Sequence, residues 1–183
     1  MKCIHIVLSF VAYIAATNSL YAHEYPWSPE IECELNEYSP VGLIPPMEKS
    51  LNDISLTHRI TQGFNSSVKA SNYHGSDYEL HGTSYSSAVD LSIRCLTDEH
   101  IKFLLGELAS RGFAAWLRRN GEDGWRGQAH IHAIWVLGKL KPQLDSQVKD
   151  WLAGRNGLVS DLPYEFWLPN SDQLLAIEAA YGQ

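Results

Sequence analysis

Cysteine is scarce in this chain of 183 residues, and its three cysteines are far apart. The sequence has no Cys-x-x-Cys pair, which disfavours a zinc site made of closely spaced thiolates. In an oxidising compartment, the simplest interpretation is one disulfide between Cys33 and Cys95, which would tie the N-terminal segment to the body of the domain.

Basic residues are also few. The sequence has 14 Lys and Arg against 21 Asp and Glu, for a formal net charge of −7. No basic stripe exists that could displace counterions from a phosphate backbone. We therefore expect no nucleic-acid partner.

Long apolar runs are missing except near the start, in MKCIHIVLSFVAYIAATNSLYA. Lys2 precedes an apolar run from Ile4 to Ala16, and small and polar residues follow up to Ala22, which is the layout of a secretory signal peptide. The apolar run is too short to span a bilayer. We expect residues 1–22 to be removed, with cleavage after Ala16 as the alternative, and the mature protein to be secreted or periplasmic with no membrane span.

Residues 23–183 have the length of one domain with a sizeable core. Residues 23–52 are rich in proline and aromatic residues with weak periodicity, and we expect them to form an extended arm over the core. Residues 66–87 are dense in Ser, Gly, His, Tyr and Asn, a composition typical of loops.

The rest of the chain shows clear hydrophobic periodicity. The expected elements are a strand at 86–94, a helix from Thr97 to Gly112 with Thr97 as its N-cap, strands at 113–119 and 129–137, and helices at 146–153 and 171–181. This order favours the α+β class. We expect a mostly antiparallel sheet, with helices packed on one face and a loop-rich site on the other.

A loop histidine, a strand aspartate and a strand His-x-His pair are expected to converge at the non-core face. His130 and His132 point to the same side of the last strand because side chains alternate with period two. Asp90 lies on the non-core face of the first strand, and His81 lies in the loop that leads into it. Zinc binds imidazole nitrogen and carboxylate oxygen and uses three protein ligands in catalytic sites. Without a metal, the same residues would be ordinary solvated polar positions.

The order of a His, a short loop, Ala-Val-Asp, a helix followed by GFAAW, and His-x-His resembles a known zinc fold. That fold is shared by D-alanyl-D-alanine carboxypeptidases, murein endopeptidases and the hedgehog signalling domain, and the resemblance covers about residues 61–135. It implies Zn²⁺ ligation by His81, Asp90 and His132, with His130 beside the metal to assist the transition state.

Two departures from the family pattern concern the metal site. The spacing between the first His and the Asp is longer than is usual in the family, so an insertion must loop out, and His74, farther upstream, is a less favoured substitute. Relatives commonly have a glutamate shortly before the last His, but residues 126–129 contain no carboxylate. Glu122 or Asp123, in the preceding loop, is the expected general base.

A third departure concerns substrate binding. Relatives often have an arginine that holds a substrate carboxylate, and the corresponding residues 62–65 contain none. Arg59, Arg118 or Arg119 is expected to take this role, and Trp125 to form one wall of the groove.

The sequence therefore predicts a secreted zinc-dependent hydrolase of the peptidase type. By resemblance, its substrate is a peptide stem of peptidoglycan, cleaved by carboxypeptidase or endopeptidase action. One alternative is a non-catalytic zinc domain that binds a cell-wall peptide or a protein partner, and another is a structural protein without metal. A mature N-terminus at His23 would also allow copper chelation.

Overall fold

The computed structural model describes residues 25–27, 35, 42–65 and 71–182. The predicted signal peptide, His23 and Cys33 lie outside the described residues, so the signal peptide and the Cys33–Cys95 disulfide stay predictions. Within the described part of the chain, no helix is long and apolar enough to cross a membrane.

The domain is built on an antiparallel sheet of four strands in the order β1-β4-β6-β5. These strands are β1 (Ile60–Gln62), β4 (Ala88–Leu91), β6 (His130–Trp135) and β5 (Phe113–Arg118). The predicted pairing of the last two strands is confirmed, with Ala115 opposite Ala133 in the register. The α+β class with a mostly antiparallel sheet is confirmed as well.

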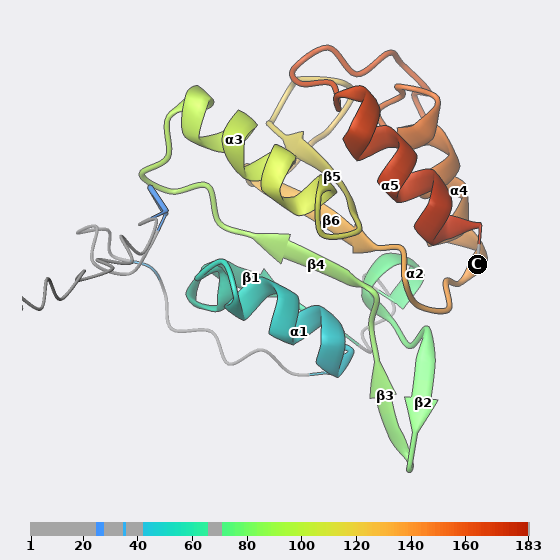
Figure 1. The fold of residues 1–183 in the computed structure, drawn as a ribbon. Coiled ribbons are helices and arrows are strands. Elements are labelled where there is room, and N and C mark those ends of the chain that lie inside the picture. The colour runs from blue at the N-terminus through green and yellow to red at the C-terminus, as the bar shows by residue number, and fades with distance from the viewer. Residues whose placement is uncertain (1–24, 28–34, 36–41, 66–70, 183) are drawn as a thin grey trace, which may run out of the picture.

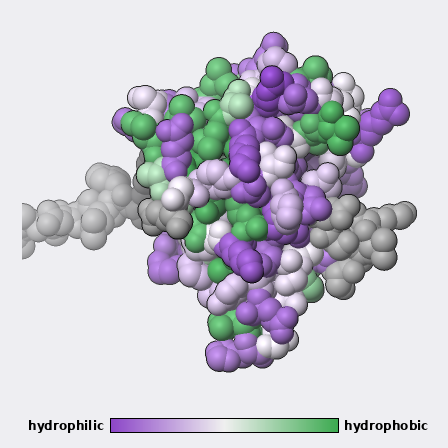
Figure 2. All heavy atoms as spheres, turned by 90° about the vertical axis from the view of Figure 1, so that its right-hand side faces the viewer, coloured by the Kyte–Doolittle hydropathy of each residue, from purple (hydrophilic) through white to green (hydrophobic). Residues whose placement is uncertain are grey.

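The helices surround this sheet, and a separate hairpin extends from it (Figure 1). The helices are α1 (Pro45–Asn52), α2 (Ser71–His74), α3 (Asp98–Ala109), α4 (Pro142–Leu152) and α5 (Ser171–Tyr181), and the hairpin consists of β2 (Tyr78–Leu80) and β3 (Thr83–Tyr85). The hairpin projects away from the body of the domain in Figure 1 and again in Figure 2, where polar and apolar residues are interspersed over the rest of the face in view.

Helix α3 begins where the sequence predicts. The hydroxyl of Thr97 accepts a hydrogen bond from the main-chain N–H of His100, and Asp98 and Glu99 lie in the first turn. Both features stabilise a helix start, the first by pairing a free N–H and the second by opposing the positive end of the helix dipole. Helix α1 was not expected, because residues 45–52 were assigned to an extended arm. Pro45 and Pro46 occupy its first turn, where proline is well tolerated, and Met47 and Leu51 are buried.

Helices cover both faces of the sheet. Helices α1 and α3 pack on one face, against a cluster that includes Val89, Leu91, Phe113, Ala115, Leu117, Ile131 and Ala133. Helices α4 and α5 pack on the other face, in a second cluster that includes Ala114, Trp116, Ile134, Leu144, Val148, Trp151 and Ile177. The prediction of helices on one face only was therefore wrong. Strand β5 is buried at every position, and a strand buried on both sides needs a cover on both sides.

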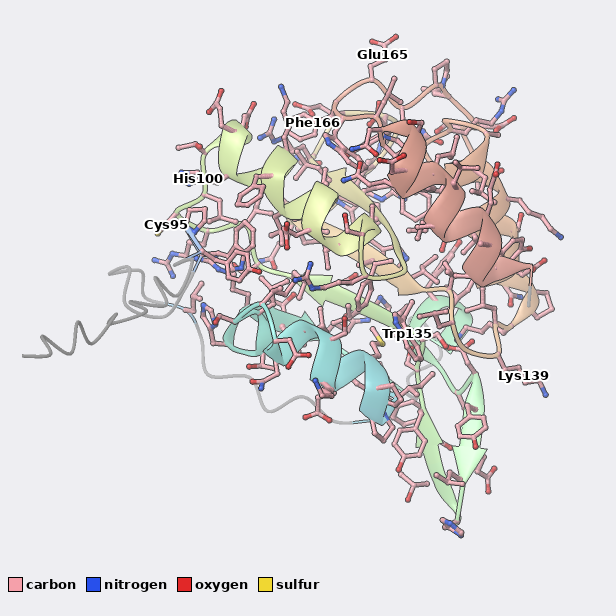
Figure 3. The ribbon with its side chains drawn as sticks, in the orientation of Figure 1. Cys95, His100, Trp135, Lys139, Glu165 and Phe166 are labelled. Atoms are coloured by element: carbon pink, nitrogen blue, oxygen red, sulfur yellow. The ribbon has the colours of Figure 1, made fainter. Side chains whose placement is uncertain are left out.

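The segment between α4 and α5 closes one end of the domain. Phe166, labelled in Figure 3, lies under two cations: the Lys102 ammonium is 5.4 Å from its ring centroid and the Arg119 guanidinium 5.2 Å. Arg119 also forms an ion pair with Asp98 at the start of α3. Arg119 therefore contributes to the packing of this end of the domain. It is not among the described residues that line the pocket beside Asp90 and His132.

Candidate metal centre

The second sheet face carries a cluster of histidines around one aspartate. Asp90 on β4 is directly opposite His132 on β6, and Trp116 on β5 is opposite His132 from the other side. Residues opposite each other in an antiparallel pair share a face, so the strand register alone brings these side chains together. Asp90 and His132 are thus neighbours, as the alternation in the sequence allowed.

The third member of the cluster is His74, the last residue of α2. Its Nε2 is 3.3 Å from Asp90 Oδ1, and His132 Nδ1 is 2.9 Å from the same oxygen. His74, Asp90 and His132 each offer one ligand atom, and these three atoms all lie within 4.8 Å of one another. They form a group that could hold a metal ion.

His81, the histidine that the family resemblance implied, is not in this group. It occupies the exposed turn between β2 and β3, with φ of +52°, and Gly82 follows with φ of +79°. Two residues with positive φ make the tight turn that twisted hairpins prefer. The stretch expected to be a loop thus contains a hairpin that carries His81 away from the sheet. The substitute that the sequence analysis ranked lower, His74, lies beside Asp90 instead.

Burial and hydrogen bonding define the charge of the cluster. Burial alone would raise the pKa of Asp90, but the neighbouring imidazoles of His132 and His74 outweigh it and hold that pKa well below its usual value. Burial lowers the pKa of His132, and the attraction of Asp90 offsets this only in part. The site therefore has one fixed negative charge and favours neutral imidazole at His132, which suits a divalent cation.

His130 lies at the edge of the cluster. Its Nε2 is 3.6 Å from Asp90 Oδ1, and its Nδ1 lies 2.9 Å from the main-chain carbonyl oxygen of Gln128. A carbonyl oxygen only accepts, so Nδ1 is the donor and carries the proton. The indole of Trp125 meets this imidazole edge to face, with ring centroids 5.0 Å apart.

A pocket of about 620 Å³ opens over these residues. Its lining includes His74, Asp90, Trp125, His130 and His132. The other described residues of the lining are Thr61, Gln62, Tyr73, Ser92, Arg118, Gln128, Ala129, Gln147 and Leu158. Among the described residues of this lining, Asp90 is the one carboxylate. The pocket therefore combines a polar floor at the cluster with aromatic and apolar walls.

Arg118 brings a buried positive charge to this pocket. It is only 2% exposed, its Nη1 donates to the main-chain oxygen of Asn156 at 2.5 Å, and its guanidinium lies 5.1 Å from the Trp116 ring. Within the described part of the chain, its buried Nη2 has no hydrogen-bond partner and Arg118 belongs to no ion pair. Burial lowers the pKa of Arg118 to about 10, so it remains charged at neutral pH.

Three other predicted site residues lie elsewhere. Glu122 is exposed, and neither it nor Asp123 belongs to the pocket lining. The main-chain oxygen of Asp123 accepts hydrogen bonds from Asn156 and Ser160, so this residue holds two loops together. The buried guanidinium of Arg59 donates to the main-chain oxygens of Trp27, Ser92 and Arg94. These placements do not support Glu122 or Asp123 as the base, or Arg59 as a substrate ligand.

Sequence reasoning missed Gln147 and Trp116 as parts of the site. Gln147 Oε1 is 3.3 Å from His132 Nε2, and the Trp116 ring stacks on His132 with centroids 6.2 Å apart and planes at 23°. Trp116 was treated as a core residue, and its place opposite His132 follows only from the strand register. For Gln147 we find no signal in the sequence.

No protein-family model, curated protein or solved structure matches the chain with significant similarity. The interpretation of the site therefore depends on its own geometry and on the sequence motifs.

Proposed function

We propose that the chain is a secreted zinc-dependent hydrolase of the peptidase type that acts on peptide stems of peptidoglycan. One observation carries the proposal: His74, Asp90 and His132 each offer one ligand atom, and these atoms lie within 4.8 Å of one another beside a pocket of about 620 Å³. Tetrahedral zinc with ligands at about 2.0–2.1 Å needs ligand atoms roughly 3.3 Å apart. The 3.3 Å between His74 Nε2 and Asp90 Oδ1 matches this value, and the 2.9 Å between His132 Nδ1 and Asp90 Oδ1 is somewhat shorter.

Three candidate ligands among the described residues favour a catalytic site over a structural one. Structural zinc sites are closed by four protein ligands, whereas catalytic sites use three. When bound, zinc would supply a Lewis acid that activates water and polarises a carbonyl group. Asp90 and the two imidazoles would hold it, and the single carboxylate would leave the centre with a net positive charge.

His130 is the group of this chain best placed to move a proton. Its Nδ1–H is held by the carbonyl of Gln128, so Nε2 is the nitrogen that faces Asp90 and the cluster. That nitrogen can accept a proton from a nucleophile and, once protonated, can donate to a developing oxyanion or a leaving amine. In this proposal His130 replaces Glu122 and Asp123 as the acid–base residue.

Arg118 and the aromatic walls favour a peptide with an anionic group. The buried Nη2 of Arg118 has no hydrogen-bond partner among the residues that the structure describes. A guanidinium binds a carboxylate with paired, charge-assisted hydrogen bonds. Trp125 and Leu158 provide apolar surface in the same pocket. A peptide stem with a free carboxylate satisfies both features.

The test uses the mature protein loaded with one equivalent of zinc. Stem peptides and cross-linked muropeptides are incubated with it, and products are identified by liquid chromatography with mass spectrometry. We expect the wild type to release an amino acid or a peptide. For His130→Gln we expect kcat to fall by about 100-fold or more, with unchanged zinc content. The matched control, His81→Gln, keeps wild-type activity because His81 is exposed at the hairpin turn.

A second candidate is a non-catalytic zinc domain that binds a peptide. The observation in its favour is that the described lining of the pocket has no carboxylate other than Asp90, which is itself a ligand. If the zinc-loaded protein binds stem peptides but releases no product, this candidate replaces the hydrolase. If the purified protein takes up no zinc, both give way to a structural protein without metal.

A further inference from the structure

Gln147 is a buried glutamine of α4 whose side-chain amide contacts a cluster residue and a loop at the same time. Its Nε2 donates to the main-chain carbonyl oxygen of Gly157 at 2.9 Å, and its Oε1 lies 3.3 Å from His132 Nε2. The residue is only 6% exposed, so water does not compete strongly for either contact. The amide thus links the loop after α4 to His132.

The two contacts determine which way the amide points. The carbonyl of Gly157 can only accept a hydrogen bond, so the NH₂ group must face it, and the amide oxygen must then face His132. An amide oxygen only accepts, so His132 Nε2 must carry a proton. In the neutral ring this leaves the lone pair on Nδ1, the nitrogen 2.9 Å from Asp90 Oδ1.

Two lone pairs that face each other at this distance repel, and a cation between them, either a metal ion or a second ring proton, removes the repulsion. His132 Nδ1 and Asp90 Oδ1 are both acceptors in this arrangement, and His74 Nε2 lies 3.3 Å from the same carboxylate oxygen. A ligating histidine commonly donates its other ring N–H to an oxygen, which determines the tautomer and the orientation of the ring. Gln147 stands in that position relative to His132.

We propose that Gln147 is a positioning residue that holds His132 in the Nε2–H tautomer and so presents Nδ1 to the metal. This inference rests on the metal site of the proposed function but not on peptidase activity. It assigns to the amide oxygen of Gln147 a role that its packing alone does not require. The hydrogen bond to Gly157 orients the amide for that role.

Two substitutions separate the oxygen from the rest of the side chain. Gln147→Met and Gln147→Glu both lose the N–H that donates to Gly157, but only Gln147→Met loses the acceptor for His132. Gln143→Met is the matched control, because Gln143 is exposed on the same helix. Circular dichroism and thermal unfolding of each variant establish that it is folded before any comparison.

The readouts are zinc affinity, measured by competition with a chromophoric chelator at pH 8, and the tautomer of His132, measured by long-range ¹H–¹⁵N correlation with and without zinc. We expect the Nε2–H tautomer in the wild type, in Gln147→Glu and in the control. Gln147→Met should show a mixture of tautomers and zinc binding weaker by about 10–100-fold.

The inference is overturned if Gln147→Met keeps both the Nε2–H tautomer and wild-type affinity, or if Gln147→Glu loses them to the same extent as Gln147→Met. Neither readout uses a substrate, so a protein that binds zinc and cleaves nothing leaves the inference standing while the hydrolase proposal fails. If no variant binds zinc, the tautomer in the metal-free protein decides. A wild-type His132 protonated on Nδ1 instead of Nε2 would then overturn it.

Discussion

One carboxylate oxygen organises the whole cluster. Asp90 Oδ1 lies 2.9 Å from His132 Nδ1, 3.3 Å from His74 Nε2 and 3.6 Å from His130 Nε2. With His132 in the proposed Nε2–H tautomer, this oxygen cannot accept hydrogen bonds from all three imidazoles. A cation at the centre of the group would resolve this conflict, and the identity of its ligands can be tested residue by residue.

Replacing His74 distinguishes the proposed ligand set of His74, Asp90 and His132 from the set implied by family resemblance. His74→Ala removes one of the three ligand atoms, so zinc affinity should fall by more than the roughly 100-fold that loss of an outer contact can cost. His81→Ala should leave affinity unchanged, because His81 is exposed at the hairpin turn. Competition titration measures both. The opposite pattern would restore His81 as the ligand.

Replacing Arg118 should weaken the binding of carboxylate peptides without lowering the free energy of unfolding. Burial lowers the pKa of Arg118 to about 10, which means that folding disfavours its charged form by roughly 3 kcal/mol. Arg118→Met removes this cost but leaves the main-chain oxygen of Asn156 without its donor. We expect the free energy of unfolding to stay level or to rise by about 1–2 kcal/mol in urea titrations, while affinity for carboxylate peptides falls at least tenfold.

Arg119→Met is the control for this pair of measurements. Arg119 is the next residue along the chain, but it contacts Asp98 and Phe166 and not the pocket. Its exposed ion pair contributes little to stability. If Arg119→Met weakened peptide binding as much as Arg118→Met does, the anion-binding role would not belong to Arg118.

At the scale of elements, the hairpin β2–β3 separates His74 from Asp90 along the chain. Asp77 stands at its base: its carboxylate accepts the main-chain N–H of Ser87 at 2.8 Å and that of Lys141 at 3.1 Å. It thereby joins the start of β4 to the segment that leads into α4. The hairpin can project from the body because this buried carboxylate anchors its base.

Removing that anchor should destabilise the fold. Asp77→Ala leaves two main-chain N–H groups without their acceptor, and each unsatisfied buried donor costs about 1–3 kcal/mol. We expect the free energy of unfolding, from urea titration, to drop by about 2–4 kcal/mol. Glu79→Ala, on an exposed strand of the same hairpin, should change it by less than about 0.5 kcal/mol. Equal effects of the two would mean that Asp77 is not an anchor.

Periodic patterns made some elements predictable, and tertiary packing decided the others. Helix α3 and its Thr97 cap, strands β4, β5 and β6, and the sharing of a face by Asp90 and His132 follow from alternation and helical spacing. The two strands of the hairpin have three residues each, too short to show a period, so the displacement of His81 was not visible in the sequence. The contact of Gln147 with His132 depends on how α4 packs on the sheet, which no local pattern encodes.

At the scale of the whole molecule, the cluster draws on elements that are far apart in the sequence. Its three members come from α2, β4 and β6, and Gln147 adds α4 through its contact with His132. Strands β4 and β6 and helix α4 also contribute to the second hydrophobic cluster, which includes Ala88, Ile134 and Val148. An ion bound here would therefore cross-link much of the fold in its native arrangement and bind little to the unfolded chain.

Zinc should accordingly raise the thermal stability of the whole domain. A ligand at 1,000 times its Kd stabilises the native state by about 4 kcal/mol, and in a domain of this size each kcal/mol shifts Tm by about 2–4 °C. We expect scanning calorimetry to show a Tm about 10 °C higher with zinc than with a chelator. Magnesium should produce no such shift, because it prefers oxygen ligands to imidazole. Asp90→Asn should abolish the zinc-dependent shift, since it removes the central charge of the cluster; a shift that survives this substitution would place the stabilising ion elsewhere in the protein.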